Sequence, residues 1–228
     1  MSLKKSEGNM YPWVTHTHAH LGGECPHKCK YCYVDNPRWG RPEKYKGELR
    51  LIEKEFGTKY GEGKTIFMEN CNDLFAAEVP ADFIRRIIAH SQAWPNNAYV
   101  FQSKRPARMV DFAALIPENS MIGTTIETNR DTAQIGQAPH PKDRYRAMLA
   151  LRQFRSFVTI EPIIKFDLDE LAGWISEIQP EFVNIGADSK NHGLPEPTIE
   201  EVDRLISKLK GWDIEIREKH NLGRLRNG

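Results

Sequence analysis

Short runs rich in β-branched and aromatic residues alternate with longer amphipathic segments over most of the chain. The runs have the length and composition of buried strands. After a first strand expected near 13–21, they occupy residues 65–70, 98–103, 120–127, 155–163 and 181–187, with an edge strand at 212–218. The sequence therefore predicts six or seven strands, each followed by a connection long enough for a helix.

The intervening segments carry apolar residues at helical spacing. Ile84, Ile87 and Ile88 form one apolar face behind Pro80, a residue that favours the first turn of a helix. Further helices are expected at 106–116 and 143–154, and after Asp167 and Thr198. A glutamate three residues beyond each of these last two, Glu170 and Glu201, gives the spacing of a capping box.

Regular alternation of strands and helices predicts a parallel sheet with right-handed crossovers. Eight units would close a full barrel, and this chain is too short for eight. We therefore expect an α/β fold of the partial, open (β/α)6-type TIM barrel class, with residues 1–228 forming a single domain. The charged, Gly- and Pro-containing segment 36–64 is expected to be an elaborated connection between the first two units, with a short helix at 50–56.

Composition narrows the class of protein without identifying a partner. The chain has 228 residues and a formal net charge of +1, which neither demands nor excludes a nucleic-acid ligand. It contains no apolar run near the roughly 18 residues of a membrane span, and its start lacks the apolar segment of a signal peptide. We expect a cytoplasmic protein without membrane contact, in which thiols stay reduced.

Three of the four cysteines, Cys25, Cys29 and Cys32, lie within eight residues. A structural zinc site and a ferredoxin cluster each require four ligands, whereas three thiolates on a [4Fe–4S] cluster leave one iron open to a substrate or cofactor. The alternative is a zinc-binding structural module in which His27 or another histidine completes the ligand set.

Polar residues follow every predicted strand. In a parallel β/α fold, chemistry collects at the carboxyl ends of the strands. The residues at these ends are Glu69, Asn70, Cys71, Ser103, Lys104, Thr125, Glu127, Asn129, Glu161 and Asp188. The recurrence of such groups predicts a functional rim on that side of the sheet.

The segment "CPHKCKYC" matches the CxxxCxxC signature of the radical S-adenosylmethionine (radical SAM) superfamily, with the aromatic Tyr31 before its last cysteine. The segments "MENCNDLF", "VFQSKRPARM", "IGTTIETN", "FVTIEPI" and "VNIGADS" resemble the successive strand ends of a phage-associated family of radical SAM proteins of unassigned function. That family is distantly similar to spore photoproduct lyase, a DNA-lesion repair enzyme whose cluster loop also runs into a tyrosine, as this loop runs into Tyr33.

The resemblance implies an enzyme with one [4Fe–4S] cluster and S-adenosylmethionine. Cys25, Cys29 and Cys32 would hold three irons, and the fourth would chelate S-adenosylmethionine. Reductive cleavage would yield a 5′-deoxyadenosyl radical that abstracts hydrogen from a substrate. The electron would come from a small donor protein of the flavodoxin or ferredoxin type. The substrate is expected to be a nucleotide or nucleic acid, with a small metabolite or peptide as the alternative.

The resemblance also implies roles for the strand-end residues. The Tyr31 backbone would face the adenine, Glu69 or Asn70 would accept the methionine amino group, and Lys104 would pair with the methionine carboxylate. Thr125, Glu127 and Asn129 would contact the ribose or sulfonium. Glu161 and Asp188 would line the substrate side.

Two further features have open interpretations. Cys71 is either a small buried apolar residue or, with Tyr33, a hydrogen-atom donor near the radical. His16, His18 and His20 alternate along the first strand and so share one face, which we expect to point into the barrel. They either form a hydrogen-bonded polar row or contact substrate, or they belong to a mononuclear metal hydrolase, which would need further ligands at later strand ends.

Overall fold

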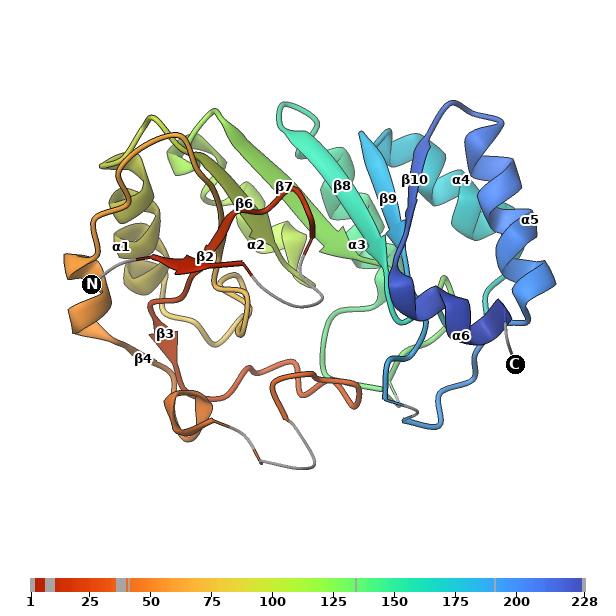
Figure 1. Ribbon diagram of the computed structural model, residues 1–228, viewed down its shortest axis with the longest axis horizontal. Coiled ribbons are helices and arrows are strands. Elements are labelled where there is room, and N and C mark those ends of the chain that lie inside the picture. The colour runs from red at the N-terminus through yellow and green to blue at the C-terminus, as the bar shows by residue number, and fades with distance from the viewer. Residues whose placement is uncertain are drawn as a thin grey trace.

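A computed structural model of the chain describes residues 3–6, 11–35, 40, 42–133, 135–190 and 192–226 (Figure 1). Its main sheet has eight strands in the order β1-β2-β5-β6-β7-β8-β9-β10. Their bounds are β1 Lys4–Lys5, β2 His16–His18, β5 Thr65–Met68, β6 Ala98–Gln102, β7 Ser120–Thr125, β8 Arg155–Ile160, β9 Phe182–Ile185 and β10 Glu215–Glu218. Only β1 pairs in the antiparallel sense, so the described sheet is mostly parallel and open, with β1 and β10 at its edges.

Helices connect successive parallel strands, as the alternation predicted. They are α1 Ala81–Gln92, α2 Pro106–Val110, α3 Pro141–Leu149, α4 Leu168–Ile178, α5 Ile199–Lys210 and the short α6 Gly223–Arg226. The predicted strands and helices from residue 65 onward are present, with shifted ends. The expected helix at 106–116 breaks into α2 and a 3₁₀ turn, η3 Ala113–Leu115, and the helix expected at 143–154 begins earlier and ends at Leu149.

The chain before residue 65 departs further from the sequence-based expectation. The first strand, expected at 13–21, divides into β2 and β3 Leu21–Gly22; β3 pairs with β4 Arg50–Leu51 in a separate two-stranded sheet. The expected helix at 50–56 is wrong, because that segment forms β4 and a 3₁₀ helix, η2 Glu53–Gly57. A second 3₁₀ helix, η1, spans Glu43–Tyr45. Residues 36–39 and 41 of the predicted connection lie outside the described residues.

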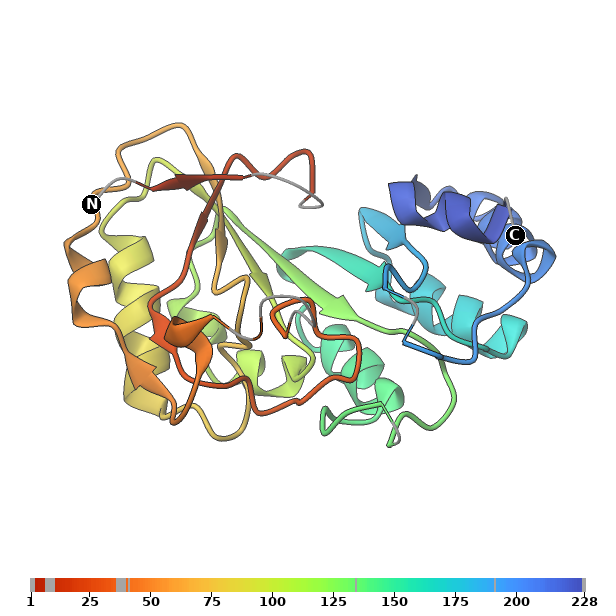
Figure 2. The ribbon, with the colours of Figure 1, turned by 60° about the horizontal axis from the view of Figure 1, so that its bottom comes forward.

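The helices cover one face of the sheet and the N-terminal segment covers the other (Figures 1 and 2). On the helical side, Ile66 and Met68 of β5 join Ile84 and Ile87 of α1 in the larger apolar core. Burial of such side chains supplies the main driving force for closing this layer.

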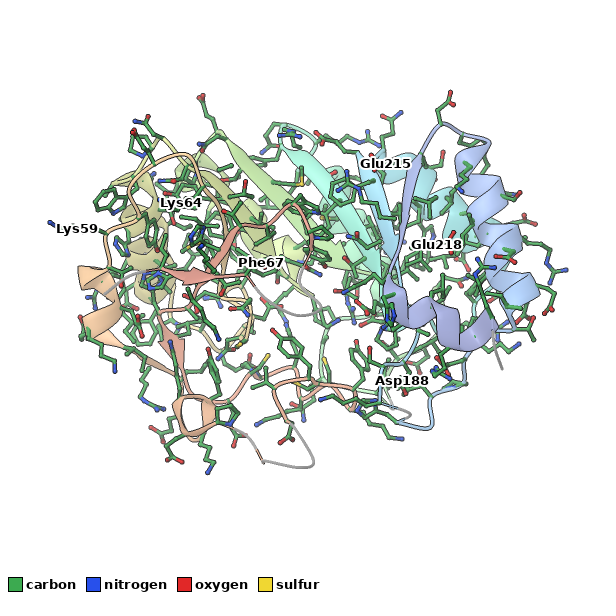
Figure 3. The ribbon with its side chains drawn as sticks, in the orientation of Figure 1. Lys59, Lys64, Phe67, Asp188, Glu215 and Glu218 are labelled. Carbon is green, nitrogen blue, oxygen red and sulfur yellow. The ribbon has the colours of Figure 1, made fainter. Side chains whose placement is uncertain are left out.

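The opposite face of the sheet has a smaller core built on aromatic rings. Phe67, labelled in Figure 3, packs there with Phe157, Phe182 and Tyr11. The Tyr11 hydroxyl donates to Gln102 Oε1 at 2.9 Å, which fixes the N-terminal segment against the sheet.

Only one of the two predicted capping boxes is present. Thr198 accepts from the Glu201 amide at 3.3 Å, and Glu201 accepts in return from the Thr198 amide at 2.7 Å. Asp167 starts α4 without a side-chain cap, because its carboxylate pairs with Arg130 at 2.6 Å. No helix of the described residues is long and apolar enough to cross a membrane.

Candidate functional site: the cysteine loop at the strand ends

The three clustered cysteines lie in the loop that follows β3, and this loop runs along the rim formed by the carboxyl ends of the parallel strands (Figure 1). Backbone hydrogen bonds fix it at both ends. The Gly23 amide donates to the Lys44 carbonyl at 2.9 Å, the Lys30 amide to Ile135 at 2.8 Å, and Gln137 to the His27 carbonyl at 2.7 Å. The loop is therefore held by η1, which lies between β3 and β4, on one side and by the segment after β7 on the other.

His27, inside the cysteine motif, is anchored to the second strand unit. Its Nε2 lies 2.8 Å from Asp73 Oδ2, and both side chains are buried. Asp73 also accepts from the Ser103 hydroxyl at 2.7 Å and from the Lys104 amide at 2.7 Å. Burial alone would raise the pKa of Asp73. His27 and these two donors outweigh that effect and hold the pKa below its usual value. Asp73 thus ties the cysteine loop to the ends of β5 and β6.

Glu127, just beyond β7, is the electrostatic centre of the rim. It is 1% exposed and binds two cations, Lys104 Nζ at 2.7 Å and Arg144 Nη1 at 2.8 Å. The Tyr31 hydroxyl donates to the same carboxylate. Although burial alone would raise it, Arg144 and Lys104 lower the Glu127 pKa to about 2.

Around Glu127 itself, two cations face one carboxylate, so this part of the rim has one positive charge in excess, whereas Asp73 brings a negative charge to the Cys25 side of the loop. Lys104 Nζ also lies 5.2 Å from the centre of the Tyr31 ring, within cation–π range. The excess charge favours an anionic group at this end of the sheet, such as a thiolate or a ligand carboxylate.

Cys25, Cys29 and Cys32 are free and partly exposed. Burial, followed by the charge of Asp73, raises the pKa of Cys25 to about 12, and burial raises the pKa of Cys29. The Cys25 and Cys29 thiols are therefore neutral on their own at physiological pH. Metal binding would displace their protons, as it does at other thiolate sites.

Tyr33 and Cys71 lie together at the edge of the loop. The Tyr33 hydroxyl donates to the Asn70 carbonyl and lies 3.8 Å from Cys71 Sγ. Tyr33 is 57% exposed, an unusual position for a large aromatic side chain. Phenol and thiol thus form a contact pair next to Cys32, with the phenol ring exposed.

Glu69 binds the segment that leads into the cysteine loop. It is 2% exposed, and its carboxylate accepts from the His20 amide at 2.6 Å, His20 Nδ1 at 2.9 Å and the Leu21 amide at 3.0 Å. These three bonds occupy the oxygens that we expected to receive a methionine amino group. Asn70, by contrast, contacts the cysteine loop, because its carbonyl accepts from the Tyr33 hydroxyl.

The expectation that the histidines point into the barrel is wrong. His16 and His18 are in register with Ile66 and Met68, whose side chains belong to the core beneath the helices. Alternation placed His16 and His18 on a common face correctly, but the face is the helical one. The His16 ring forms a hydrogen bond with the Thr15 hydroxyl, whereas His18 and His20 lie beside His90 of α1.

The remaining predicted residues spread along the rim in separate networks. Thr125 accepts from Gln102 at 3.0 Å, and Asn129 receives the Asp167 amide at 2.8 Å, which places it at the start of α4. Glu161 pairs with Lys219 at 2.7 Å. Asp188, labelled in Figure 3, accepts from His192 Nδ1 at 2.6 Å.

The structure thus brings Tyr31, Lys104 and Glu127 together at the cysteine loop. Asn129 instead accepts a hydrogen bond from the backbone at the start of α4. Sequence reasoning missed two buried residues of the site, Asp73 and Arg144. Asp73 had a usable signal, because it follows the end of β5 within a motif already singled out. Arg144 sits in an ordinary basic helix sequence, and nothing local marks it as buried.

Comparison with known proteins gives one family and one fold. Residues 12–189 match the model of the family described as "Protein of unknown function (DUF5131)". No curated protein matches the chain.

Among solved structures, a cysteine-to-serine variant of spore photoproduct lyase superposes with a TM-score of 0.64 at 11% identity, covering 92% of this chain and 78% of that one. A tyrosine-to-phenylalanine variant gives 0.63 at 11% identity, with 95% and 80% covered. A third variant, with bound AdoMet and dinucleoside spore photoproduct, gives 0.56 at 12% identity, with 92% and 65% covered. The chain therefore shares the fold of spore photoproduct lyase.

Proposed function

The chain belongs to the family of proteins of unknown function DUF5131, and from its site we propose that it is a radical SAM enzyme with one [4Fe–4S] cluster held by Cys25, Cys29 and Cys32. The observation that carries the proposal is the position of these three free thiols, in CxxxCxxC spacing, in a loop fixed across the carboxyl ends of parallel strands. The shared fold of spore photoproduct lyase supports the same reading, including the partial-barrel arrangement expected from the sequence.

The donor set fits such a cluster better than a zinc ion. A single zinc with Zn–S bonds of about 2.3 Å would bring the sulfurs to about 3.8 Å from one another. Among the described residues, the group of metal-ligating atoms within 4.8 Å of each other is a set of histidines, and the cysteines do not form one. His27, the nearest candidate for a fourth zinc ligand, uses its Nε2 to bind Asp73.

When bound, a [4Fe–4S] cluster with an open iron supplies reductive cleavage of S-adenosylmethionine to a 5′-deoxyadenosyl radical. The chain's own groups would bind and orient the cofactor. The positive charge left over around Glu127 favours the methionine carboxylate, and Lys104 is the more exposed of the two cations. Tyr31, fixed by Glu127 and stacked under Lys104, holds the backbone before Cys32 that would face the adenine.

Tyr33 and Cys71 are the proposed hydrogen-atom donors. A thiol and a phenol 3.8 Å apart can pass a hydrogen atom between them, and Tyr33 lies where a substrate entering the open rim would meet it. Glu161 and Asp188 would line the substrate side further along the rim, with Thr125 between them and the cofactor. The proposal does not extend to Glu69 and Asn129, whose polar atoms serve His20 and α4.

The proposed substrate is a nucleotide or nucleic acid. Support comes from the fold neighbour that carries AdoMet together with a dinucleoside photoproduct. The proposed electron source is a small flavodoxin- or ferredoxin-type protein, since the cluster needs an external one-electron donor.

The test is anaerobic reconstitution with iron and sulfide, reduction with dithionite, and chromatography of the nucleoside products. The wild-type protein should convert S-adenosylmethionine to 5′-deoxyadenosine, Cys29→Ala should abolish the conversion, and Cys71→Ala should retain it. Lys104→Met should raise the KM for S-adenosylmethionine more than it lowers kcat. A colourless protein without cleavage activity, whose tightly bound zinc is lost on Cys29→Ala, would overturn the proposal and favour a structural zinc module at the cysteine loop.

The substrate class is tested separately in the same assay. Substrates deuterated at the sugar or the base methyl group should transfer deuterium to 5′-deoxyadenosine if a nucleotide is the substrate. Cleavage without transfer from any dinucleotide or DNA duplex would overturn the substrate assignment and leave the enzyme class standing.

A further inference from the structure

A second group of metal-ligating side chains lies between the sheet and the helices. It consists of His18 of β2, His20 in the link between β2 and β3, and His90 in the last turn of α1; one ring nitrogen from each lies within 4.8 Å of the others. His18 is 7% exposed and His20 is 0% exposed. The residues come from distant parts of the chain, so the fold itself assembles the group.

Each imidazole has its outer nitrogen fixed by an oxygen acceptor. His18 Nε2 faces Glu55 Oε2 at 3.3 Å, His20 Nδ1 faces Glu69 Oε1 at 2.9 Å, and His90 Nε2 faces the Thr58 carbonyl at 3.1 Å. Histidines that ligate a metal almost always donate the other ring N–H to a carboxylate or a backbone carbonyl, which fixes the tautomer and leaves the inner nitrogen bare. All three histidines of this group follow that pattern.

The inner nitrogens face one another, and the group has one hydrogen too few to give each of them a hydrogen bond. The Tyr60 hydroxyl lies 2.7 Å from His18 Nδ1 and can donate its one hydrogen there. His20 Nε2 and His90 Nδ1 then face each other at 2.7 Å. With both outer nitrogens protonated, two lone pairs would meet, and buried acceptors in contact without a donor are costly. One positive charge at this position removes the conflict.

We propose that His18, His20 and His90 form a buried binding site for a divalent transition-metal ion, which we take to be Zn²⁺. The Tyr60 hydroxyl lies beside the fourth coordination position. Zinc accepts neutral imidazoles at about 2.0–2.1 Å in tetrahedral geometry, which requires nitrogen separations of about 3.3 Å. His20 and His90 would therefore move apart by about 0.6 Å on binding, and His18 Nδ1 would exchange the hydrogen bond from Tyr60 for the metal. Tyr60 lies 3.5 Å from His20 Nε2, so its oxygen is already near the ligand set.

The site is structural in character. It joins β2, the turn that leads into the cysteine loop, η2 through Glu55 and the C-terminal end of α1, and its histidines are covered by Phe56 and Tyr60 rings. The competing explanation is a proton in place of the metal, which would make one ring an imidazolium balanced by Glu69. The two explanations differ in what the protein binds, so they can be separated without any assay of enzymatic activity.

The experiment uses the full chain with Cys25→Ser, Cys29→Ser and Cys32→Ser, so that the cysteine loop cannot take the probe. Metal-free protein is titrated with Co²⁺ under an optical readout, and bound Co²⁺ is then displaced with Zn²⁺. One equivalent should give the visible bands of tetrahedral cobalt without the near-ultraviolet thiolate charge-transfer band. Zinc at a hundredfold excess over its Kd should raise the Tm by roughly 5–10 °C.

His90→Gln and His18→Asn should each weaken Co²⁺ binding by on the order of 100-fold or more, since even outer-shell changes cost about 10–100-fold. His16→Gln is the matched control, because His16 lies on the same strand but outside the group, and it should bind like the parent. X-ray absorption of the zinc-loaded parent should show three imidazole nitrogens, which keeps the test valid if a variant fails to fold. Absence of Co²⁺ binding, or equal binding in all variants, would overturn the site and favour the shared proton.

Discussion

Replacing Glu127 with glutamine is the sharpest test of how the rim is held together. The substitution removes one negative charge at a position 1% exposed and leaves Lys104 and Arg144 facing each other across an amide. Breaking a buried ion pair by removing one partner costs about 3–5 kcal/mol, because the other charge stays buried without compensation.

The pKa of Glu127 gives an independent magnitude. It falls from 4.5 to about 2 in the folded protein, and each unit is worth about 1.4 kcal/mol, so ionisation of this carboxyl contributes about 3 kcal/mol to stability. Because the folded pKa is the lower one, the contribution is complete above pH 4.5 and is lost as the pH falls toward 2.

The assay is thermal and urea unfolding of the metal-free protein followed by circular dichroism from neutral pH down to the acid limit of reversibility. Glu127→Gln should lose about 3 kcal/mol at pH 7, a fall in Tm of roughly 6–12 °C for a chain of this size. The variant should also lose less stability than the wild type between pH 4.5 and 3.

Glu181→Gln is the matched control, since Glu181 pairs with Arg155 at 2.6 Å in solvent and such pairs are worth at most about 1 kcal/mol. A loss below about 1 kcal/mol for Glu127→Gln, or parallel acid profiles for it and the wild type, would refute this account of the rim.

Three further predictions concern the frame around the site. Gly123→Ala should lower the free energy of unfolding by about 1–3 kcal/mol, since a β-carbon there would overlap the Phe157 ring; unchanged urea unfolding would contradict it. Asp73→Asn should lower the free energy of unfolding by about 2–3 kcal/mol and reduce the iron bound on reconstitution, because an amide cannot accept all the hydrogen bonds that the carboxylate receives from His27, Ser103 and the Lys104 amide. A full iron content in this variant would contradict the prediction. Thr198→Ala should cost about 1 kcal/mol through loss of the capping box, measured by thermal melting, and no change in Tm would show that the cap is not stabilising.

The order of strands and helices was predictable because it depends on local patterns. Buried β-branched runs such as 120–127, and the apolar stripe of α1, report their structure through their own sequence. The crowding of Cys25, Cys29 and Cys32 in one loop was also readable, because it follows from their spacing along the chain. Both features could be predicted because neither depends on residues far away in the sequence.

Features that depend on long-range partners were not predictable in the same way. Alternation along His16 and His18 shows that they share a face, yet it cannot say which face meets the helices; that depends on the register with β5. Likewise, the sequence suggested Glu69 as a cofactor ligand, but it could not show that this carboxylate binds His20 in the link between β2 and β3. Arg144 reaches Glu127 across 17 residues, and nothing in its neighbourhood in the sequence indicates burial.

The most direct test of the central claim is electron paramagnetic resonance of the reconstituted, dithionite-reduced protein with and without S-adenosylmethionine. The account predicts about four irons per chain, a reduced [4Fe–4S] signal, and a change in that signal on adding S-adenosylmethionine, because the ligand occupies the iron that Cys25, Cys29 and Cys32 leave open. A cluster whose signal is unchanged by S-adenosylmethionine, or a protein that takes up no iron, would contradict it.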